Sequence, residues 1–252
     1  MNLVGELHDL ILSSTNTVVF TGAGVSTGSG IRDFRGKHGI YNDTFRGYRV
    51  EELFGIDLFN SDPSLFYTWA KDFVYDLEAF QPCIVHHVLA RLERSGLLKT
   101  IVTQNIDRLH TLAGSQHVLE VHGSPSLHHC QKCGAMLTYD EVAPIVRAGE
   151  VPMCACGGVF KPDIVFYGEN LPEAVFSQAV RACQEADLIL VLGSSLTVYP
   201  AAALPEEGYR FGARVVIVND SPTQLDRRAI LKLDDLTDTF MQLGALLDGS
   251  LP

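Results

Sequence analysis

The sequence predicts an α/β fold, a Rossmann-like doubly wound parallel sheet with a smaller inserted zinc-binding module and a helical insert. Three observations lead to this prediction. Short apolar runs alternate with amphipathic segments along the chain, which is typical of strands alternating with helices. The first apolar run ends in a glycine-rich turn, as in nucleotide-binding units. A segment rich in Cys and Gly then interrupts the alternation.

Residues 1–95 are expected to supply four helical segments and one strand. Residues 2–13 carry Leu and Ile at helical spacing and predict an amphipathic helix. The β-rich run 17–21 predicts a strand, and the small residues after Gly24 predict a second helical segment. Further helices are expected over 64–80 and 83–95.

The rest of the chain supplies most of the expected sheet. Residues 100–103 and 118–121 predict buried strands, and so does the run 214–218. Residues 187–192 form a continuous apolar run, which is typical of a parallel strand covered on both faces. The last helix is expected over about 237–247.

These elements predict a discontinuous domain organisation. The Rossmann-like nucleotide-binding domain is expected over 1–36, 81–126 and 164–252. Residues 37–80 would form a cofactor loop and helical insert, and 127–163 a zinc-binding module that needs its metal to fold.

Composition limits the classes of protein to consider. The 252 residues are 46% apolar and 19% charged, the balance of a folded protein. The formal net charge of −11 argues against direct nucleic-acid binding and would suit a Lys-rich partner or ordinary solubility equally well. No run approaches the roughly 18–20 apolar residues of a membrane span, and the N-terminus lacks the basic start of a secretory signal. We therefore expect a cytoplasmic protein without membrane association, and its oligomeric state stays open.

The glycine turn Gly22-Ala23-Gly24 lets the backbone approach phosphates closely. Its spacing to Gly28 departs from G-x-G-x-x-G. The acid that usually ends a second strand is also missing, because Asp43 falls in a polar stretch. Phosphate binding and an ordinary tight turn both remain open from this motif alone.

Four of the six cysteines lie within 27 residues and predict a metal site: Cys130, Cys133, Cys154 and Cys156. Four thiolates from two turns make a closed tetrahedral site, typical of structural zinc. Unliganded or oxidised thiols are the alternative. His128 and His129 adjoin the first pair and could compete as ligands, although the cysteines already complete the site. The other two cysteines, Cys83 and Cys183, are expected to be buried packing residues.

Polar side chains follow two of the expected strands. Gln104, Asn105 and Asp107 come after one of them and could contact a sugar and a carboxamide, because ligands of α/β sheets collect at strand carboxyl ends. A polar turn capping the next helix is the plainer interpretation. His122 follows the next strand beside Gly123 and could act as a general base or be a structural histidine.

Together these residues resemble the sirtuin family, in its compact bacterial and archaeal form. The matching pieces occur in the family's order over about residues 18–220: Gly22–Ser26, Gly30–Gly36, Thr103–Asp107, His122–Gly123, the Cys pairs, Pro162–Glu169, Gly193–Leu196 and Val216–Asn219.

The resemblance implies an enzyme, an NAD-dependent protein-lysine deacetylase or deacylase that releases nicotinamide, free lysine and O-acyl-ADP-ribose. NAD would be the co-substrate, zinc the structural metal, and acyl-lysine proteins or peptides the partners. His122 would be the general base, and Asn105 and Asp107 would hold the nicotinamide. The cofactor site implied by the resemblance comprises Gly22, Ala23, Gly24, Ser26, Thr27, Asp33, Phe34, Arg35, Gln104, Asn105, Ile106, Asp107, His122, Gly193, Ser194, Ser195 and Asn219. The implied substrate site comprises Val165, Phe166, Gly168, Val198 and Tyr199.

Three features of the sequence bear on that resemblance. Arg32 stands where the family usually has Pro, which predicts a looser cofactor loop because Pro fixes φ. The second cysteine pair, Cys154 and Cys156, is separated by one residue instead of two, which restricts the conformation of the turn that carries these two zinc ligands. Members that prefer acidic acyl groups carry Tyr-x-x-Arg, and the nearest match here runs from Tyr67 to Ala70, so we hypothesise apolar acyl substrates.

Other activities compete with deacylation. A protein mono-ADP-ribosyltransferase would use the same NAD site, and label from adenine-labelled NAD would then appear on protein. A nonenzymatic NAD sensor is disfavoured because Asn105, Asp107 and His122 occur together. A dehydrogenase is disfavoured by the missing ribose acid.

Overall fold

The computed structural model describes residues 2–34 and 39–250, which form two compact units. The first unit comprises residues 1–31, 81–121 and 173–252, and the second comprises 32–80 and 122–172. The chain crosses between the units four times, so both are discontinuous in sequence. The finer division into a cofactor loop and a zinc module stays a prediction.

The first unit is built on a six-stranded sheet with the order β11-β10-β9-β1-β4-β5, in which every neighbouring pair is parallel. Numbered along the chain within this sheet, the order is that of the Rossmann fold, whose direction reverses beside the first strand. The strands are β1 (Thr17–Thr21), β4 (Thr100–Thr103), β5 (Val118–Glu120), β9 (Leu188–Leu192), β10 (Arg214–Val218) and β11 (Leu231–Leu233). The reversal between β1 and β9 is where such folds bind ligands.

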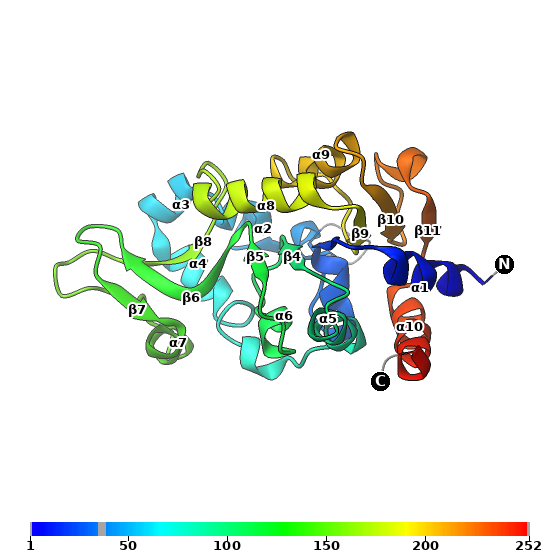
Figure 1. Cartoon of the computed structure of the whole chain (residues 1–252). Helices are drawn as coiled ribbons and strands as arrows, with labels where there is room; N and C mark the ends of the chain where they lie inside the picture. The colour runs from blue at the N-terminus through cyan, green and yellow to red at the C-terminus, as the bar shows by residue number, and fades with distance from the viewer. Residues whose placement is uncertain (1, 35–38, 251–252) are drawn as a thin grey trace. The chain divides into compact units, whose positions relative to one another are not determined.

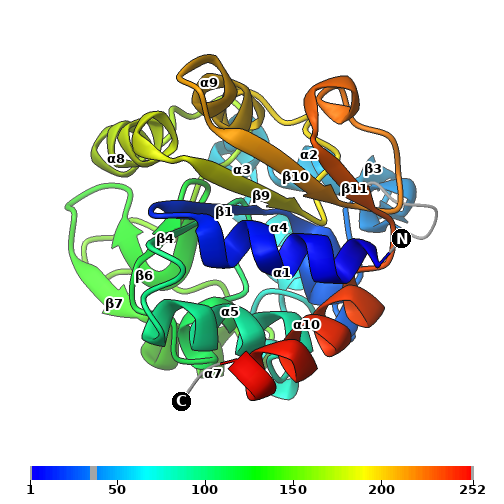
Figure 2. The ribbon, with the colours of Figure 1, turned by 45° about the vertical axis from the view of Figure 1, so that its right-hand side comes forward.

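Helices cover both faces of this sheet (Figure 2). On one face lie α1 (Leu3–Ser13), α5 (Ile84–Arg94) and α10 (Leu236–Ser250), whose apolar residues form a buried cluster with the strands. On the other lie α8 (Glu173–Glu185) and α9 (Leu204–Arg210). Because both faces are covered, β1 and β9 are buried along their whole length. The short α6 (Leu109–Leu112) follows β4.

The second unit contains a three-stranded antiparallel sheet with the order β7-β6-β8 (Figure 1). Its strands are β6 (Gly123–Cys130), β7 (Met136–Thr138) and β8 (Phe160–Ile164), accompanied by α7 (Tyr139–Arg147). A small hairpin, β2 (Thr44–Phe45) and β3 (Tyr48–Arg49), precedes the helices α2 (Val50–Leu53), α3 (Ile56–Ser61) and α4 (Pro63–Ala70). Edge-to-face and tilted aromatic contacts hold these helices to Phe166, and they involve Phe54, Phe59 and Phe66.

The structure confirms the predicted fold class and the strands at 17–21, 100–103, 187–192 and 214–218. The helix predicted over 64–80 is wrong beyond Ala70. There the carbonyl of Ala70 accepts from the backbone amides of Phe73, Val74 and Tyr75, so the chain turns out of the helix.

Two other expectations change in form. The segment after the glycine turn is a 3-10 helix, η1 (Ala23–Ser29), which ends at Gly30 in the left-handed region with φ 88°. The segment 127–163, expected to need its metal to fold, also has an apolar face of its own, because α7 buries Tyr139, Val142, Ala143 and Val146. Among the described residues, no helix is long and apolar enough to cross a membrane.

Candidate active site

Two glycine turns cross at the carboxyl edge of the first unit's sheet. The amide of Gly22 donates to the carbonyl of Leu192 at 3.0 Å, and that of Gly24 donates to Gly193 at 2.9 Å. A Cβ on Gly24 would lie 2.8 Å from the Cα of Gly193, so a side chain would separate the turns. Gly193 itself has φ 57° and would place a Cβ 2.5 Å from the Val25 nitrogen. Both turns therefore require glycine, and bare backbone lines the point where the strand order reverses.

A buried hydrogen-bond network joins this crossing to the end of β4. The Asn105 side-chain amide donates to the Gly22 carbonyl and to the Ser26 hydroxyl, both at 3.1 Å. Ser26 Oγ donates to Asp107 Oδ2 at 2.6 Å. The backbone amide of Leu109 donates to the other carboxylate oxygen at 2.9 Å. The structure thus brings Ser26 together with Asn105 and Asp107, which follow it by 79 and 81 residues in sequence.

Burial shapes the charge of this network. Asp107 is 7% exposed, and burial raises the pKa of its carboxyl, against the lowering effect of hydrogen bonds from Ser26 and Leu109. Beside it, Ser194 Oγ donates to Gln104 Oε1 at 3.3 Å. Hydroxyl, amide and carboxyl groups are suited to sugar hydroxyls and a carboxamide, so this edge fits the NAD that the sequence predicted.

A second buried layer supports Asn105 and was missed by sequence reasoning. The Thr103 hydroxyl accepts a hydrogen bond from the backbone amide of Asn105 at 3.0 Å and another from the Thr21 hydroxyl at 2.8 Å. Thr21 Oγ1 also lies 3.0 Å from Nε2 of His110. Burial lowers the pKa of His110 to about 3, so this histidine stays neutral and structural at physiological pH. Such contacts between neighbouring strands leave no periodic signal in the sequence.

The other predicted cofactor residues of the first unit lie in these loops or at the end of β10. Ala23 and Thr27 lie in η1, where Thr27 Oγ1 donates to the Gly24 carbonyl at 2.8 Å. Ile106 is half-buried between Asn105 and Asp107. Ser195 is exposed after β9, and Asn219 is buried at the end of β10, where its side-chain amide donates to the Ser221 carbonyl at 2.7 Å.

The predicted substrate residues divide between the units. Val198 and Tyr199 follow β9 in the first unit, with Tyr199 59% exposed. Val165, Phe166 and Gly168 follow β8 in the second unit, where Phe166 is buried.

The second unit also carries His122, Asp33 and Phe34. His122 is half-buried just before β6, and its backbone carbonyl accepts from the Val165 amide at 2.9 Å. This bond ties the predicted base to the predicted substrate segment. The Phe34 ring lies 5.1 Å from that of Tyr41. Arg35, predicted to contact NAD, lies outside the described residues.

Arg32, the residue expected to loosen the cofactor loop, has an ionic partner. Its Nη1 donates to Asp43 Oδ2 at 2.7 Å and its Nη2 to Oδ1 at 3.3 Å. The Arg32 guanidinium therefore lowers the pKa of the Asp43 carboxyl. Both side chains are about half exposed, so the pair contributes little to stability.

The four predicted zinc ligands converge in the second unit. The sulfur atoms of Cys130, Cys133, Cys154 and Cys156 all lie within 4.8 Å of one another. Cys130 and Cys156 are 3.5 Å apart at sulfur, and Cys133 and Cys154 are 3.7 Å apart. Zinc–sulfur bonds of about 2.3 Å at tetrahedral angles need sulfur separations near 3.8 Å, so the cluster fits zinc.

The C-x-C pair therefore reaches the cluster despite its narrow spacing. The glycines after it shape the knuckle, because a Cβ on Gly158 would lie 2.6 Å from the Cys130 sulfur. The two neighbouring histidines have other partners. His128 Nε2 lies 2.7 Å from the Tyr75 hydroxyl, and His129 Nδ1 lies 2.6 Å from Asp163 Oδ1.

The two cysteines outside the cluster differ. Cys183 is fully buried, as predicted. Cys83 is only half-buried at the start of α5, where its sulfur lies 3.1 Å from Nδ1 of His86. Cys83 still packs against the apolar cluster of the first unit, so the prediction of a packing residue is confirmed, but helix initiation leaves its side chain only half-buried beside polar groups.

The fold and these sites define a class, an α/β protein with a Rossmann-type ligand edge and a four-cysteine zinc module. Comparison with known proteins identifies the family within this class. The Sir2 family model matches residues 22–200, and the chain belongs to that family.

Curated relatives cover nearly the whole chain. An NAD-dependent protein deacetylase of Thermotoga maritima is 44% identical over 90% of this chain and 91% of the relative. One of Sulfolobus acidocaldarius is 41% identical over 94% of this chain and 91% of the relative.

Solved structures agree. A Sir2 structure described with a deacetylated p53 peptide and 3'-O-acetyl ADP ribose has a TM-score of 0.89, is 40% identical and covers 98% of each chain. A Sir2 structure bound to a propionylated peptide has a TM-score of 0.86, is 39% identical and covers 99% of each chain.

Proposed function

We propose that this protein removes acyl groups from lysine side chains of proteins, using NAD as co-substrate. One observation carries the proposal. The crossing of the glycine turns at the strand-order reversal is bonded directly to Asn105 and, through Ser26, to Asp107. In a member of the Sir2 family, whose curated relatives are NAD-dependent deacetylases, this edge is the place for the dinucleotide.

When bound, NAD would supply an electrophilic ribose carbon for the acyl oxygen, with nicotinamide as the leaving group. The bare backbone of Gly22, Gly24 and Gly193 allows close approach of the phosphates. Asn105 and Asp107 hold the carboxamide end through polar groups whose positions Ser26 fixes. Ordered polar groups of this kind lower the barrier because they need no rearrangement during the reaction.

His122 is proposed as the general base, accepting the proton of a ribose hydroxyl at a ring nitrogen. Its backbone bond to Val165 places it next to the segment proposed to line the acyl-lysine site. Zinc would be held by the four cysteine sulfurs and would stabilise the module without entering the reaction.

The aromatic surroundings of Phe166 support a preference for apolar acyl groups. Phe54, Phe59 and Phe66 contact its ring, and Ala70 is fully buried where a pocket arginine would have been expected for acidic acyl groups. A carboxylate-bearing acyl group would lose its hydration there without gaining a cation. We further propose a cytoplasmic location and protein or peptide partners that bear apolar acyl-lysines.

The test is mass spectrometry of an acetyl-lysine peptide incubated with the enzyme, with and without NAD. We expect loss of the acetyl group and formation of O-acetyl-ADP-ribose only when NAD is present. A matched succinyl-lysine peptide should react more slowly. NAD consumption with label transferred to protein, and no deacylated peptide, would instead identify an ADP-ribosyltransferase.

A further inference from the structure

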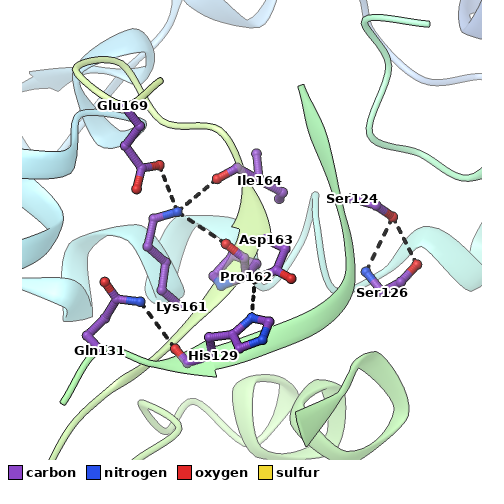
Figure 3. Close-up of polar contacts among 9 residues, drawn as sticks. All are labelled: Ser124, Ser126, His129, Gln131, Lys161, Pro162, Asp163, Ile164 and Glu169. Carbon is purple, nitrogen blue, oxygen red and sulfur yellow. Dashed lines mark hydrogen bonds and ion pairs between the residues drawn. The ribbon is translucent and has the colours of Figure 1, made fainter. Parts of the chain in front are cut away.

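A buried lysine that no motif marked lies beneath the proposed substrate segment (Figure 3). Lys161 is on β8, 5% exposed, and its ammonium has three oxygen atoms within hydrogen-bond distance. It lies 2.8 Å from Glu169 Oε2, 2.8 Å from the Ile164 carbonyl and 3.2 Å from the Pro162 carbonyl. An ammonium has three N–H groups, and each has an acceptor here.

Glu169 closes the other end of the same segment. Its Oε2 accepts from the Phe166 amide at 2.7 Å, while the Glu169 amide donates to the Phe166 carbonyl at 3.0 Å. One carboxylate oxygen thus joins Lys161 to the backbone of Phe166. The ammonium also lies 4.2 Å from the centroid of the Phe166 ring, a cation–π contact.

The two charged side chains therefore fix residues 164–169 from the inside of the second unit. The turn they close contains Gly168, whose φ of 95° favours glycine. A parallel bridge between Gly55 and Tyr167 fixes the middle of the segment. In this bridge the Tyr167 amide donates to the Phe54 carbonyl at 2.7 Å, and the Ile56 amide donates to the Tyr167 carbonyl at 3.0 Å.

We propose that Lys161 and Glu169 are positioning residues for the acyl-lysine peptide. They hold the turn of residues 166–169, and with it the backbone of residues 165–167 beside which a peptide strand adds, and they set the Phe166 ring. This inference rests on the proposed function, because it takes Val165, Phe166 and Gly168 as the substrate surface. Pre-ordering a binding segment strengthens binding, because less conformational entropy is lost when the peptide docks.

An ion pair buried only for stability would behave differently when altered. Its loss would lower the melting temperature and affect NAD and peptide alike. Loss of an ion pair that positions the substrate segment would weaken binding of the peptide and leave binding of NAD unchanged. The distinguishing readout is therefore the KM for an acetyl-lysine peptide against the KM for NAD.

The main variants are Lys161→Met, which keeps the apolar stem, and the pair Glu169→Gln and Glu169→Ala. The amide of Gln still offers an oxygen to Lys161 and to the Phe166 amide, whereas Ala offers none. We expect Lys161→Met and Glu169→Ala to raise the peptide KM about tenfold or more, from the loss of a charge-assisted bond. The KM for NAD should stay within about twofold, and Glu169→Gln should recover most of the peptide affinity.

Glu78→Gln is the matched control. It removes an ion pair of the same unit, the 3.0 Å contact between Glu78 and Arg147, which involves no residue of the segment 164–169. Its peptide KM should match that of the wild type. All variants are purified with zinc, and their zinc content and melting temperature are measured.

Hydrogen exchange at the Phe166 backbone amide tests whether Glu169 holds this segment, and it needs no measurement of enzyme activity. Exchange should be slow in the wild type and in Glu169→Gln, and fast in Glu169→Ala. Unchanged exchange and peptide KM in Glu169→Ala would overturn the inference, as would equal rises in the KM values for peptide and NAD. If Lys161→Met does not fold, the two Glu169 variants decide the question. A wild type with slow exchange but no deacylation would instead count against the proposed function.

Discussion

Ser26→Ala tests whether the active-site network is organised as the structure shows. Ser26 is 1% exposed, donates to Asp107 and accepts from Asn105. The substitution removes a hydroxyl and introduces no new contact. A hydrogen bond to a charged group contributes about 1.5–3 kcal/mol and one between neutral groups about 1 kcal/mol. We therefore expect the variant to lose about 2–4 kcal/mol of unfolding free energy at neutral pH.

The loss should depend on pH in a defined direction. Burial raises the pKa of Asp107 above its ordinary value of 3.8. A carboxyl that binds its proton more tightly when folded lowers stability as the pH rises from the unfolded pKa through the folded one. Removing the Ser26 hydroxyl raises that folded pKa further. The deficit of Ser26→Ala is thus greatest above the folded pKa of Asp107 and shrinks as the pH falls through it, because protonation removes the charge that the Ser26 hydroxyl stabilises.

Urea denaturation at several pH values measures this effect. Ser29→Ala is the matched control, since Ser29 lies in the same 3-10 helix and its buried hydroxyl has no partner among the described residues. It should change stability by less than about 0.5 kcal/mol. A Ser26→Ala deficit no larger than that of Ser29→Ala, or one that stays constant with pH, would refute the reasoning.

Three further outcomes are expected. His122→Ala should keep NAD affinity and lose about 10²–10⁴-fold in deacylation rate; near-normal turnover would remove it as the base. Cys130→Ala should abolish stoichiometric zinc in atomic spectroscopy and destabilise the second unit, and a folded, metal-free wild type would contradict this. Asp187, which bonds to Ser14, Thr15 and Asn16, has its pKa lowered to about 2. Because this group stabilises the chain above its unfolded pKa, Asp187→Asn should cost about 1 kcal/mol at neutral pH, after allowance for solvent screening, and the cost should shrink as the pH falls through about 2.

Much of the fold could be predicted because its strands are apolar on both faces. The run at β9 needs no tertiary information to be recognised, and the same holds for β1 and β10. Prediction failed where the pattern was interrupted or mixed. The helix at 64–80 was too long, because the turn at Ala70 is made by backbone bonds that apolar spacing does not mark.

The candidate site shows the same division. Cysteine spacing was enough to predict the metal ligands, since thiolates in two close pairs have few other uses in a reducing compartment. Lys161 was missed because a single lysine between Phe160 and Pro162 resembles any surface lysine in sequence. Only the fold shows it buried against Glu169.

By itself, the sequence determined the class of fold, the metal ligands and the family, because each depends on local patterns or on motifs in a fixed order. The tertiary structure decided which polar groups meet. In the folded chain Ser26 donates a hydrogen bond to Asp107, and the turn at Gly24 contacts the turn at Gly193. The Lys161 ammonium lies against the Phe166 ring. The first two contacts join residues far apart along the chain, and the third depends on the turn after β8. Their energies depend on burial and distance, which arise only when the strands align.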